Sequence, residues 1–338
     1  MERYSRQAAL KKIGLDGQRK LTEARVCVIG IGGLGCVSTL QLAGMGVGYL
    51  RLVDHDVVDL TNLQRQLLYD MASIGVPKVE VAEKKLKSIN PEIEIEPITM
   101  TVNPHTVKEA VEGMDVVVDG LDRIRSRYAV NEICVKLKVP YVFGSAIETY
   151  GSASTIIPRK TGCLSCFFGK VNDEELPTCE YVGVAPPILR VIASIQVWET
   201  VSLLLGQEPA LANKLLFFSL DPLAMEIFPV SKFKECGICG SKAKERGDGV
   251  KYLISELCGE NSFMVSTMKV KSFNLRNVAE ILRGKFKIKV RSNFGLTFDY
   301  CDGVSVSFMK TGNMLIKGVK TKEEAEKIYS AVLEMVEV

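Results

Sequence analysis

Apolar stretches alternate with polar and glycine-rich segments along the first half of the chain. Residues 25–54 begin with an apolar stretch, continue through a glycine-rich turn into a longer apolar segment, and end with a second apolar stretch that stops at Asp54. Short apolar runs bounded by turn residues are typical of buried strands. Residues 25–54 therefore predict a strand, a helix and a second strand.

The same alternation continues beyond this unit. A helix is predicted at about 78–89, because its apolar residues recur at helical spacing and an Asn-Pro pair ends it. Three more strands are expected at IEIEPITM, DVVVDG and YVFGSA, with helical segments between them. Strands that alternate with helices favour a mostly parallel, doubly wound sheet, so residues 1–150 predict an α/β fold.

After residue 150 the pattern changes. One long apolar helix is expected near 187–205, and strands are expected at GSASTIIP, LLFFSL and MEIFPV. These strands are predicted to extend the sheet with antiparallel neighbours. The region as a whole is expected to be a Rossmann-like, doubly wound mixed sheet.

A charged, glycine-containing segment without apolar periodicity follows this region. Residues 241–250 are therefore predicted to be a linker between a first domain at 1–240 and a second at 251–338. The second domain is expected to be a small α+β unit with a strand, a helix, three strands and a final helix, where LTFDY and VSVSFM are counted together as one strand.

Composition adds only broad limits. The chain has 338 residues, of which 47% are hydrophobic and 25% charged, so it is expected to be globular. Its formal net charge of +3 is too small to indicate a nucleic-acid or membrane partner. The polar N-terminus resembles no signal peptide, and no uninterrupted apolar stretch reaches the ~18 residues of a spanning helix. A cytoplasmic protein is therefore expected.

The glycine-rich turn has the pattern of a nucleotide-binding loop. Four glycines stand between the first strand and its helix: Gly30, Gly32, Gly33 and Gly35. Glycine lets the backbone approach a phosphate, and a helix N-terminus offers it free N–H groups. Asp54 follows Gly35 by 19 residues, where such folds place a carboxylate on ribose hydroxyls. These residues favour a nucleotide site without distinguishing NAD from ATP; the alternative is a tight turn with a capping acid.

Polar residues after Asp54 indicate more than one phosphate. Arg65 offers a forked set of donors, Asn62 can hydrogen-bond phosphate oxygens, and Lys78 stands at a helix start where it adds a positive charge. Each of them alone is equally compatible with a solvated surface position. Together, three donors that converge on one site indicate a polyphosphate.

Two CxxC pairs have the spacing of a metal site. Their members are Cys163, Cys166, Cys236 and Cys239. Four thiolates in two such pairs are the usual ligands of a tetrahedral structural zinc, and disulfides are the alternative. Disulfides persist poorly in a reducing cytosol, so zinc is the preferred interpretation.

The motifs occur in the order expected of one enzyme family. SRQ at 5–7, GIGGLG, VDHDVVDLTNLQRQ, GVPKVE, DGLDRIRSRY, CLSC, PTCEYVGV and CGICG follow one another along the chain. Over about residues 3–240 the sequence resembles the ThiF/MoeB/HesA family, whose members are similar to the adenylation half of ubiquitin-activating enzymes. Many of them use ATP to activate the C-terminal Gly-Gly of a small ubiquitin-like sulfur carrier. The long gap between the two CxxC pairs is also the arrangement of this family.

The resemblance implies a role for each motif residue. Asp54 would hold the ribose, and Gly33, Asn62, Arg65 and Lys78 would hold the phosphates. The magnesium ion would be bound by Asp122, although the family commonly has Asp-Asn where this chain has Asp122-Arg123.

Two further residues take their roles from the resemblance alone. Arg6 would reach into the active site of a partner subunit, which implies a homodimer. Cys179 would accept the activated acyl group as a thioester or an acyl disulfide; the alternative is an ordinary loop thiol.

The second domain resembles one repeat of the TATA-binding-protein fold. DNA binding is not implied, because a single repeat lacks the paired saddle, and docking of a partner protein is the preferred role. This domain lacks a cysteine-centred loop of the rhodanese kind, so any sulfur would have to come from a separate sulfurtransferase.

The expected function is ATP-dependent adenylation of a Gly-Gly carrier with release of pyrophosphate. It would serve sulfur transfer in molybdopterin, thiamine or thiolated-tRNA synthesis, or protein conjugation. Two alternatives remain open. An NAD(P)-dependent oxidoreductase would use the glycines and Asp54 but would leave Arg65, Lys78 and Asp122 without a role. A nucleotide-dependent scaffold would dock the carrier without chemistry.

Overall fold

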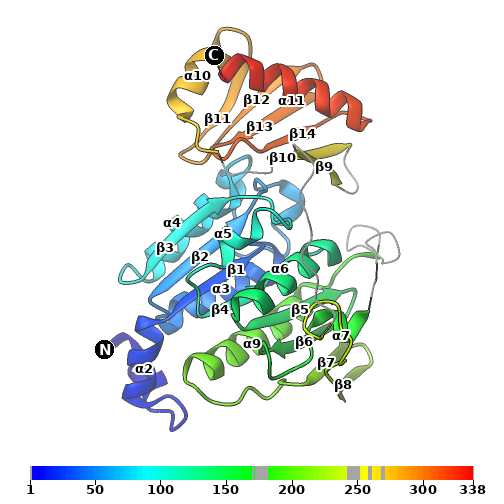
Figure 1. Cartoon of the computed structure of the whole chain (residues 1–338). Coiled ribbons are helices and arrows are strands. Elements are labelled where there is room, and N and C mark those ends of the chain that lie inside the picture. The colour runs from blue at the N-terminus through cyan, green and yellow to red at the C-terminus, as the bar shows by residue number, and fades with distance from the viewer. Residues whose placement is uncertain are drawn as a thin grey trace.

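The chain builds two β-sheets with helices packed on them, as Figure 1 shows for the computed structural model. The structure describes residues 2–169, 171, 182–241, 252–257, 261–267 and 271–337. Of the predicted linker 241–250, only Ser241 belongs to the described residues.

Five parallel strands form one side of the eight-stranded larger sheet. They are β1 (Arg25–Ile29), β2 (Tyr49–Asp54), β3 (Glu94–Thr99), β4 (Val116–Asp119) and β5 (Tyr141–Ile147). They lie in the order β3-β2-β1-β4-β5. In the centre, Val28 of β1 pairs with Leu52 of β2 on one side and Val118 of β4 on the other. The predicted parallel, doubly wound sheet is confirmed.

Helices cover both faces of this sheet. They are α2 (Gly14–Glu23), α3 (Gly33–Met45), α4 (Lys78–Ile89), α5 (Val107–Val111), α6 (Ile124–Leu137) and α9 (Pro186–Leu204). Successive strand residues point to opposite faces, so Val26 and Val28 pack with α2, α3, α4 and α9, whereas Cys27 and Ile29 pack with α5 and α6. The described residues also form short helical turns: η1 (Glu2–Tyr4), α1 (Ser5–Ala8), η2 (Leu60–Asn62), η3 (Met71–Ser73) and α7 (Leu164–Phe168). The helices predicted at 78–89 and near 187–205 are both present.

Three antiparallel strands extend the sheet beyond β5. They are β6 (Tyr150–Ile156), β7 (Lys214–Leu220) and β8 (Leu223–Pro229), in the order β5-β6-β7-β8. The predicted change from parallel to antiparallel pairing after residue 150 is confirmed, and with it the mixed sheet.

The long apolar helix α9 is a core helix by its contacts. Among the described residues it is the one helix that is long and apolar enough to cross a membrane, although Arg190 and Glu199 interrupt its apolar sequence. However, 56% of its most apolar 18-residue stretch is buried inside the structure. The Gln196 amide also donates hydrogen bonds to the backbone carbonyls of Asp119, at 2.8 Å, and Val142, at 3.1 Å. These bonds fasten α9 to the centre of the sheet.

In the residues that the structure describes, the C-terminal domain is a six-stranded antiparallel sheet with two helices on one face. Its elements are β9 (Tyr252–Leu257), β10 (Ser262–Thr267), α10 (Leu275–Arg283), β11 (Lys287–Arg291), β12 (Gly295–Cys301), β13 (Val304–Met309), β14 (Met314–Lys317) and α11 (Lys322–Val336). The strand order is β11-β12-β13-β14-β10-β9. Phe263, Phe298 and Phe308 fill the core between this sheet and its helices.

The α+β class of this domain was predicted, but its strand count was wrong. Two strands precede α10, because the chain reverses near Asn261, which adopts a φ of 48°. Four strands follow α10, because LTFDY and VSVSFM are separated at Gly303, which has a φ of 77°. Both residues are in the left-handed region that glycine and asparagine tolerate best, and such residues mark tight turns.

Candidate functional site

The glycine-rich turn after β1 packs directly on the loop after β4. Gly30 adopts a φ of 86°, and a Cβ there would lie 2.5 Å from the backbone oxygen of Gly120. A Cβ on Gly35 would lie 1.9 Å from the backbone oxygen of Gly30. Only glycine fits at both positions. Because the strand order reverses between β1 and β4, the turn lies in the crevice where doubly wound folds bind their ligands.

The N-terminus of α3 is open toward this crevice. Gly32 precedes the helix, and no side chain caps it. A Cβ on Gly32 would meet only the Gln66 amide nitrogen, at 3.9 Å, whereas one on Gly33 would press on Leu189 at 2.7 Å. Uncapped N–H groups and the helix dipole attract an anion such as a phosphate.

Asp54 ties the end of β2 to the glycine turn. Its side chain is buried, and its carboxylate accepts hydrogen bonds from the backbone N–H groups of Ile31, at 2.7 Å, and Asp56, at 2.8 Å. A carboxylate has about four acceptor positions, so two remain. Asp54 therefore has the chemistry and the position to accept hydrogen bonds from ribose hydroxyls.

Lys78 forms an ion pair at the start of α4. Its Nζ lies 2.7 Å from Oδ2 of Asp56, and its side chain is 6% exposed. Burial alone would lower the pKa of Lys78, but the carboxylates of Asp56 and Asp54 raise it above its ordinary value. Lys78 therefore stays positively charged beside the glycine turn.

The segment that carries Asn62 and Arg65 packs against the same turn. Tyr69 donates a hydrogen bond to the backbone oxygen of Ile31 at 2.7 Å. Gln66 is buried next to Gly32, and its Oε1 has no hydrogen-bond partner. A buried, unsatisfied amide oxygen costs free energy unless a ligand or water meets it. This orphaned atom is consistent with a bound molecule at the turn.

Asn62 and Arg65 themselves make local contacts. The Asn62 side chain accepts a hydrogen bond from the backbone N–H of Asp59 at 3.1 Å, as part of a capping box. Arg65 donates to the backbone oxygen of Thr61 at 2.7 Å and is half-buried. Both side chains thus lie on a segment that the structure brings to the glycine turn.

Asp122 stands at the carboxyl end of β4, on the other side of the turn. It is exposed, whereas Asp119 just before it is fully buried. Asp119 forms an ion pair with Arg127 at 3.1 Å and accepts a hydrogen bond from Tyr141 at 2.6 Å. Arg127 also donates to the backbone oxygen of Leu121, so this buried network fixes the loop that presents Asp122.

Arg6 lies away from the site that this chain builds. It is exposed on α1, next to Gln7, whose amide donates to the backbone oxygen of Met45 at 2.8 Å. Met45 ends α3, and Gly33 begins it, so at 1.5 Å per residue the two ends are about 18 Å apart. Arg6 therefore does not contact the glycine turn of its own chain.

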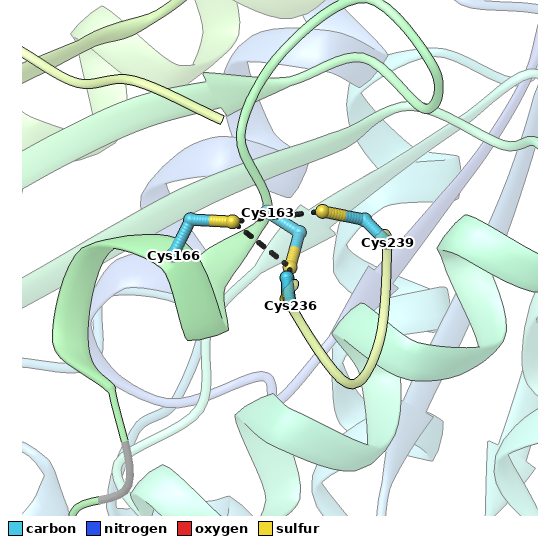
Figure 2. A group of neighbouring side chains, drawn as sticks. All are labelled: Cys163, Cys166, Cys236 and Cys239. Carbon is cyan, nitrogen blue, oxygen red and sulfur yellow. Dashed lines mark hydrogen bonds between the residues drawn. The ribbon is translucent and has the colours of Figure 1, made fainter. Parts of the chain in front are cut away.

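Four cysteines form a compact cluster, which Figure 2 shows. Cys163 and Cys166 come from the start of α7, and Cys236 and Cys239 from the loop after β8. Three Sγ–Sγ distances are 3.5, 3.7 and 4.0 Å. A tetrahedron with Zn–S bonds of 2.3 Å has sulfur atoms about 3.8 Å apart, whereas a disulfide needs about 2.05 Å.

The cluster therefore fits a tetrahedral metal site. Backbone N–H groups of Phe233 and Ile238 donate to two of the sulfur atoms, at 3.4 and 3.5 Å, as they would to thiolates. With four protein ligands, no coordination position remains for a substrate.

The predicted nucleophile Cys179 lies outside the described residues.

Several residues of the site were not predicted from the sequence. They are Asp56, Gln66, Asp119, Arg127 and Tyr141. Two of them carried a usable signal, since Asp56 follows Asp54 by two residues and Asp119 ends an apolar strand. Buried partners such as Arg127 cannot be recognised from the sequence, because their contacts depend on the fold.

The chain resembles known proteins in sequence. The sequence profile described as "ThiF family" matches residues 4–238. The chain is 34% identical over 256 residues to the SAMP-activating enzyme E1 of Haloferax volcanii, which covers 75% of this chain and 94% of that protein. It is 32% identical over 343 residues to the sulfur carrier protein ThiS adenylyltransferase of Bacillus subtilis, which covers 97% of this chain and 98% of that protein.

A solved structure has a similar fold. It is the crystal structure of MccB from E. coli with ATP, with a TM-score of 0.61 and 26% sequence identity over 66% of this chain and 68% of that one. The chain also matches proteins named adenylyltransferase and sulfurtransferase MOCS3, and it spans about half of their length.

Proposed function

The chain belongs to the ThiF family, and on that premise we propose that it is an adenylyltransferase that activates a ubiquitin-like sulfur-carrier protein. The reaction joins AMP from ATP to the C-terminal carboxylate of the carrier and releases pyrophosphate. One observation carries the proposal. The glycine turn, the buried Asp54 and the ion-paired Lys78 lie at the strand switch point of the sheet, and the exposed Asp122 follows the end of the neighbouring strand β4.

The nucleotide roles follow from these positions. We assign the ribose to Asp54 and the phosphates to the N-terminus of α3, Asn62, Arg65 and Lys78. Asp122 supplies a carboxylate for Mg²⁺, which when bound would neutralise charge on the phosphates. The exposed carboxylate fits such an ion, because Mg²⁺ keeps most of its water and takes one or two protein carboxylates.

The chemistry depends on offsetting negative charge. A carboxylate and a triphosphate repel each other, so attack at the α-phosphorus needs cations placed around both. Positioning and electrostatic stabilisation carry most of phosphoryl transfer, and the same applies here. No protein nucleophile is required for adenylation.

The cysteine cluster is assigned to a structural Zn²⁺. It links α7 to the loop after β8, which are 73 residues apart in the chain at Cys163 and Cys236. A closed four-thiolate site holds its protein ligands together without taking part in catalysis.

Other expectations extend the proposal. Arg6 is assigned to the active site of a partner subunit, in a homodimer with two composite sites, since it lies far from the site of its own chain. Cys179 is assigned to acyl transfer, and a separate sulfurtransferase to sulfur supply. The resemblance of the C-terminal domain to a TATA-binding-protein repeat and a cytoplasmic location also remain predictions.

Pyrophosphate exchange tests the central assignment. Arg6→Ala, Lys78→Ala and Asp122→Ala should each slow ATP–pyrophosphate exchange by about a hundredfold or more, equivalent to about 3 kcal/mol of barrier. Lys108→Ala is a control, because its side chain is 61% exposed on α5 and pairs only weakly with Glu112 at 3.8 Å. Normal exchange in all three variants would reject the assignment.

Two further measurements separate the alternatives. Binding of NAD in place of ATP would indicate an oxidoreductase, and ATP binding without exchange in the presence of a Gly-Gly carrier would indicate a scaffold. A reducible adduct trapped with wild type but not with Cys179→Ser would support the assigned thiol.

A further inference from the structure

The C-terminal sheet lies against the segment that follows β2. Figure 1 shows this sheet above β2, β3 and α4, with α11 on its outer side. Met264, Met309 and Leu315 project from the inner face and bury Val57, which comes three residues after Asp54. All four side chains are at most 5% exposed. A continuous apolar contact therefore joins the C-terminal domain to the edge of the nucleotide site.

Polar contacts surround this apolar centre. Thr297 donates to the backbone oxygen of Gly75 at 3.2 Å, and the backbone N–H of Phe294 donates to Glu80 at 3.2 Å. Thr311 donates to the backbone oxygen of Thr99, the last residue of β3. The C-terminal domain thus contacts residues on both sides of the segment that carries Asn62, Arg65 and Lys78.

One contact reaches that segment itself. Lys317, the last residue of β14, places its Nζ 2.8 Å from Oδ2 of Asp59. The other carboxylate oxygen of Asp59 accepts a hydrogen bond from the backbone N–H of Thr61 at 3.0 Å and so caps η2. The side-chain oxygen of Asn62 in turn accepts a hydrogen bond from the backbone N–H of Asp59 at 3.1 Å. Asp59 therefore connects Lys317 to Asn62 through two hydrogen bonds, one with each residue.

Two of the three residues of η2 contribute little apolar packing. Leu60 is 61% exposed, and Thr61 is exposed as well. Partial burial opposes the charge on Asp59, but hydrogen bonds from Lys317 and from the Thr61 backbone hold its pKa at about 2. The Asp59 carboxylate is therefore charged at neutral pH and can pair with Lys317 throughout the range in which enzymes work.

We propose that Lys317 is a positioning residue of the nucleotide site, which acts through Asp59 to hold η2 and its Asn62 and Arg65 in place. The inference rests on the proposed function, because it assigns a role in ATP binding. It also gives the C-terminal domain a function within the same chain. Lys317 touches neither nucleotide nor carrier in this scheme.

Kinetics of Lys317→Met test the proposal in the full-length protein. Loss of a positioning contact weakens the bound ground state and the transition state alike, so KM for ATP should rise roughly fivefold while kcat changes by less than about twofold. Lys317→Arg should restore KM, because it keeps the charge. Asp59→Asn should match Lys317→Met, because asparagine caps helices as well as aspartate does. The double variant should then add nothing further.

Two control variants distinguish positioning from general docking. Lys289→Met removes an ion pair with Asp299, 2.6 Å long, within the same domain and should leave KM unchanged. Thr297→Val removes the contact with Gly75 and loosens docking without touching Asp59. Equal rises of KM in Thr297→Val and Lys317→Met would overturn the proposal, as would an unchanged KM in Lys317→Met.

Hydrogen exchange of the nucleotide-free protein provides a readout that is independent of activity. Amide protons of residues 59–66 should exchange faster in Lys317→Met than in Lys289→Met, because η2 opens more often without its partner. Equal exchange would overturn the proposal. If hydrogen exchange is faster in Lys317→Met but the wild type catalyses no ATP–pyrophosphate exchange, the structural link is supported and the proposed function is rejected.

Discussion

Lys78 and Asp56 form an ion pair, 2.7 Å long, at the start of α4, with the lysine side chain 6% and the aspartate side chain 29% exposed. The sequence suggested Lys78 as a phosphate ligand, and the structure shows its charge already engaged by a carboxylate. A phosphate that binds Lys78 must therefore share it with Asp56. Asp56 keeps this lysine charged and oriented before a nucleotide arrives.

Replacing Lys78 by Met should reduce stability as well as activity. The variant leaves the Asp56 carboxylate without its cation in a largely buried place, which should cost about 2–3 kcal/mol in the free energy of unfolding. Lys108→Met is the matched control, because it breaks an exposed i,i+4 pair and should cost less than about 0.5 kcal/mol. Urea denaturation of both variants provides the comparison, and equal midpoints would contradict the importance of the pair.

The stability difference between wild type and Lys78→Met should depend on pH in a direction that the pKa shifts of the two residues determine. The pKa of Asp56 is lowered from 3.8, so its contribution is present above pH 3.8 and is lost as the pH falls through the folded value. The pKa of Lys78 is raised from 10.5, so its contribution is present below pH 10.5 and is lost as the pH rises through the folded value. The stability difference between wild type and Lys78→Met should therefore be constant from about pH 5 to 9. A difference that changes steeply near neutrality would contradict this pairing.

Two glycines of α3 should respond to alanine in opposite directions. In Gly35→Ala the new Cβ would lie 1.9 Å from the backbone oxygen of Gly30, so the turn must shift, at a cost of about 3 kcal/mol. Gly44 is exposed in the same helix with no atom within 4 Å of its Cβ position, so Gly44→Ala should stabilise by about 0.5–1 kcal/mol. Thermal melts and ATP titrations check both. Full ATP affinity in Gly35→Ala would contradict a close backbone–phosphate contact.

The parallel part of the fold could be predicted because each of its strands, turns and helices has a pattern within a few neighbouring residues. Val26 and Val28 stand in a short apolar run, and glycines follow it at once, so strand, turn and helix are each visible within a few residues. The four cysteines were equally visible, because each CxxC pair is a local spacing. The confirmed parts of the prediction are those in which neighbours in sequence determine the structure.

The site contacts that escaped prediction are those that only the folded chain creates. Lys317 meets Asp59 across 258 positions, and no spacing rule links a lysine at the end of a C-terminal strand to an aspartate near a glycine turn. Arg127 and Asp119 are close in sequence, but their pairing depends on which face of α6 the sheet buries. Arg6 is the opposite case. Its motif can be recognised from neighbouring residues, but the site to which it is assigned belongs to another subunit.

The cysteine cluster should hold one Zn²⁺ per chain. Cys163→Ser removes a fully buried ligand and should abolish binding and destabilise the protein by roughly 4 kcal/mol or more. Cys301→Ser, at an exposed thiol, should change neither. Elemental analysis and thermal melts provide the measurements. Native protein that lacks zinc, with these four thiols unreactive because they are oxidised, would contradict the metal site.

Removing Arg127 should be more damaging than removing Tyr141, although both contact the Asp119 carboxylate. Arg127→Met leaves a fully buried charge without its cation, which should cost about 3–5 kcal/mol in the free energy of unfolding. Tyr141→Phe removes one hydrogen bond, 2.6 Å long, to the same carboxylate and should cost about 1–2 kcal/mol. Arg127 also holds the backbone of Leu121, next to Asp122.

The two variants should therefore differ in metal dependence as well. Arg127→Met should need more Mg²⁺ for half-maximal pyrophosphate exchange, because the loop that presents Asp122 is no longer fixed, whereas Tyr141→Phe should keep the Mg²⁺ requirement of wild type. Urea titrations give the stabilities, and Mg²⁺ titrations of exchange, at a temperature where both variants are folded, give the requirement. If both variants lost stability but neither changed its Mg²⁺ requirement, the network would serve the fold alone, and the link from Arg127 through Leu121 to Asp122 would be wrong.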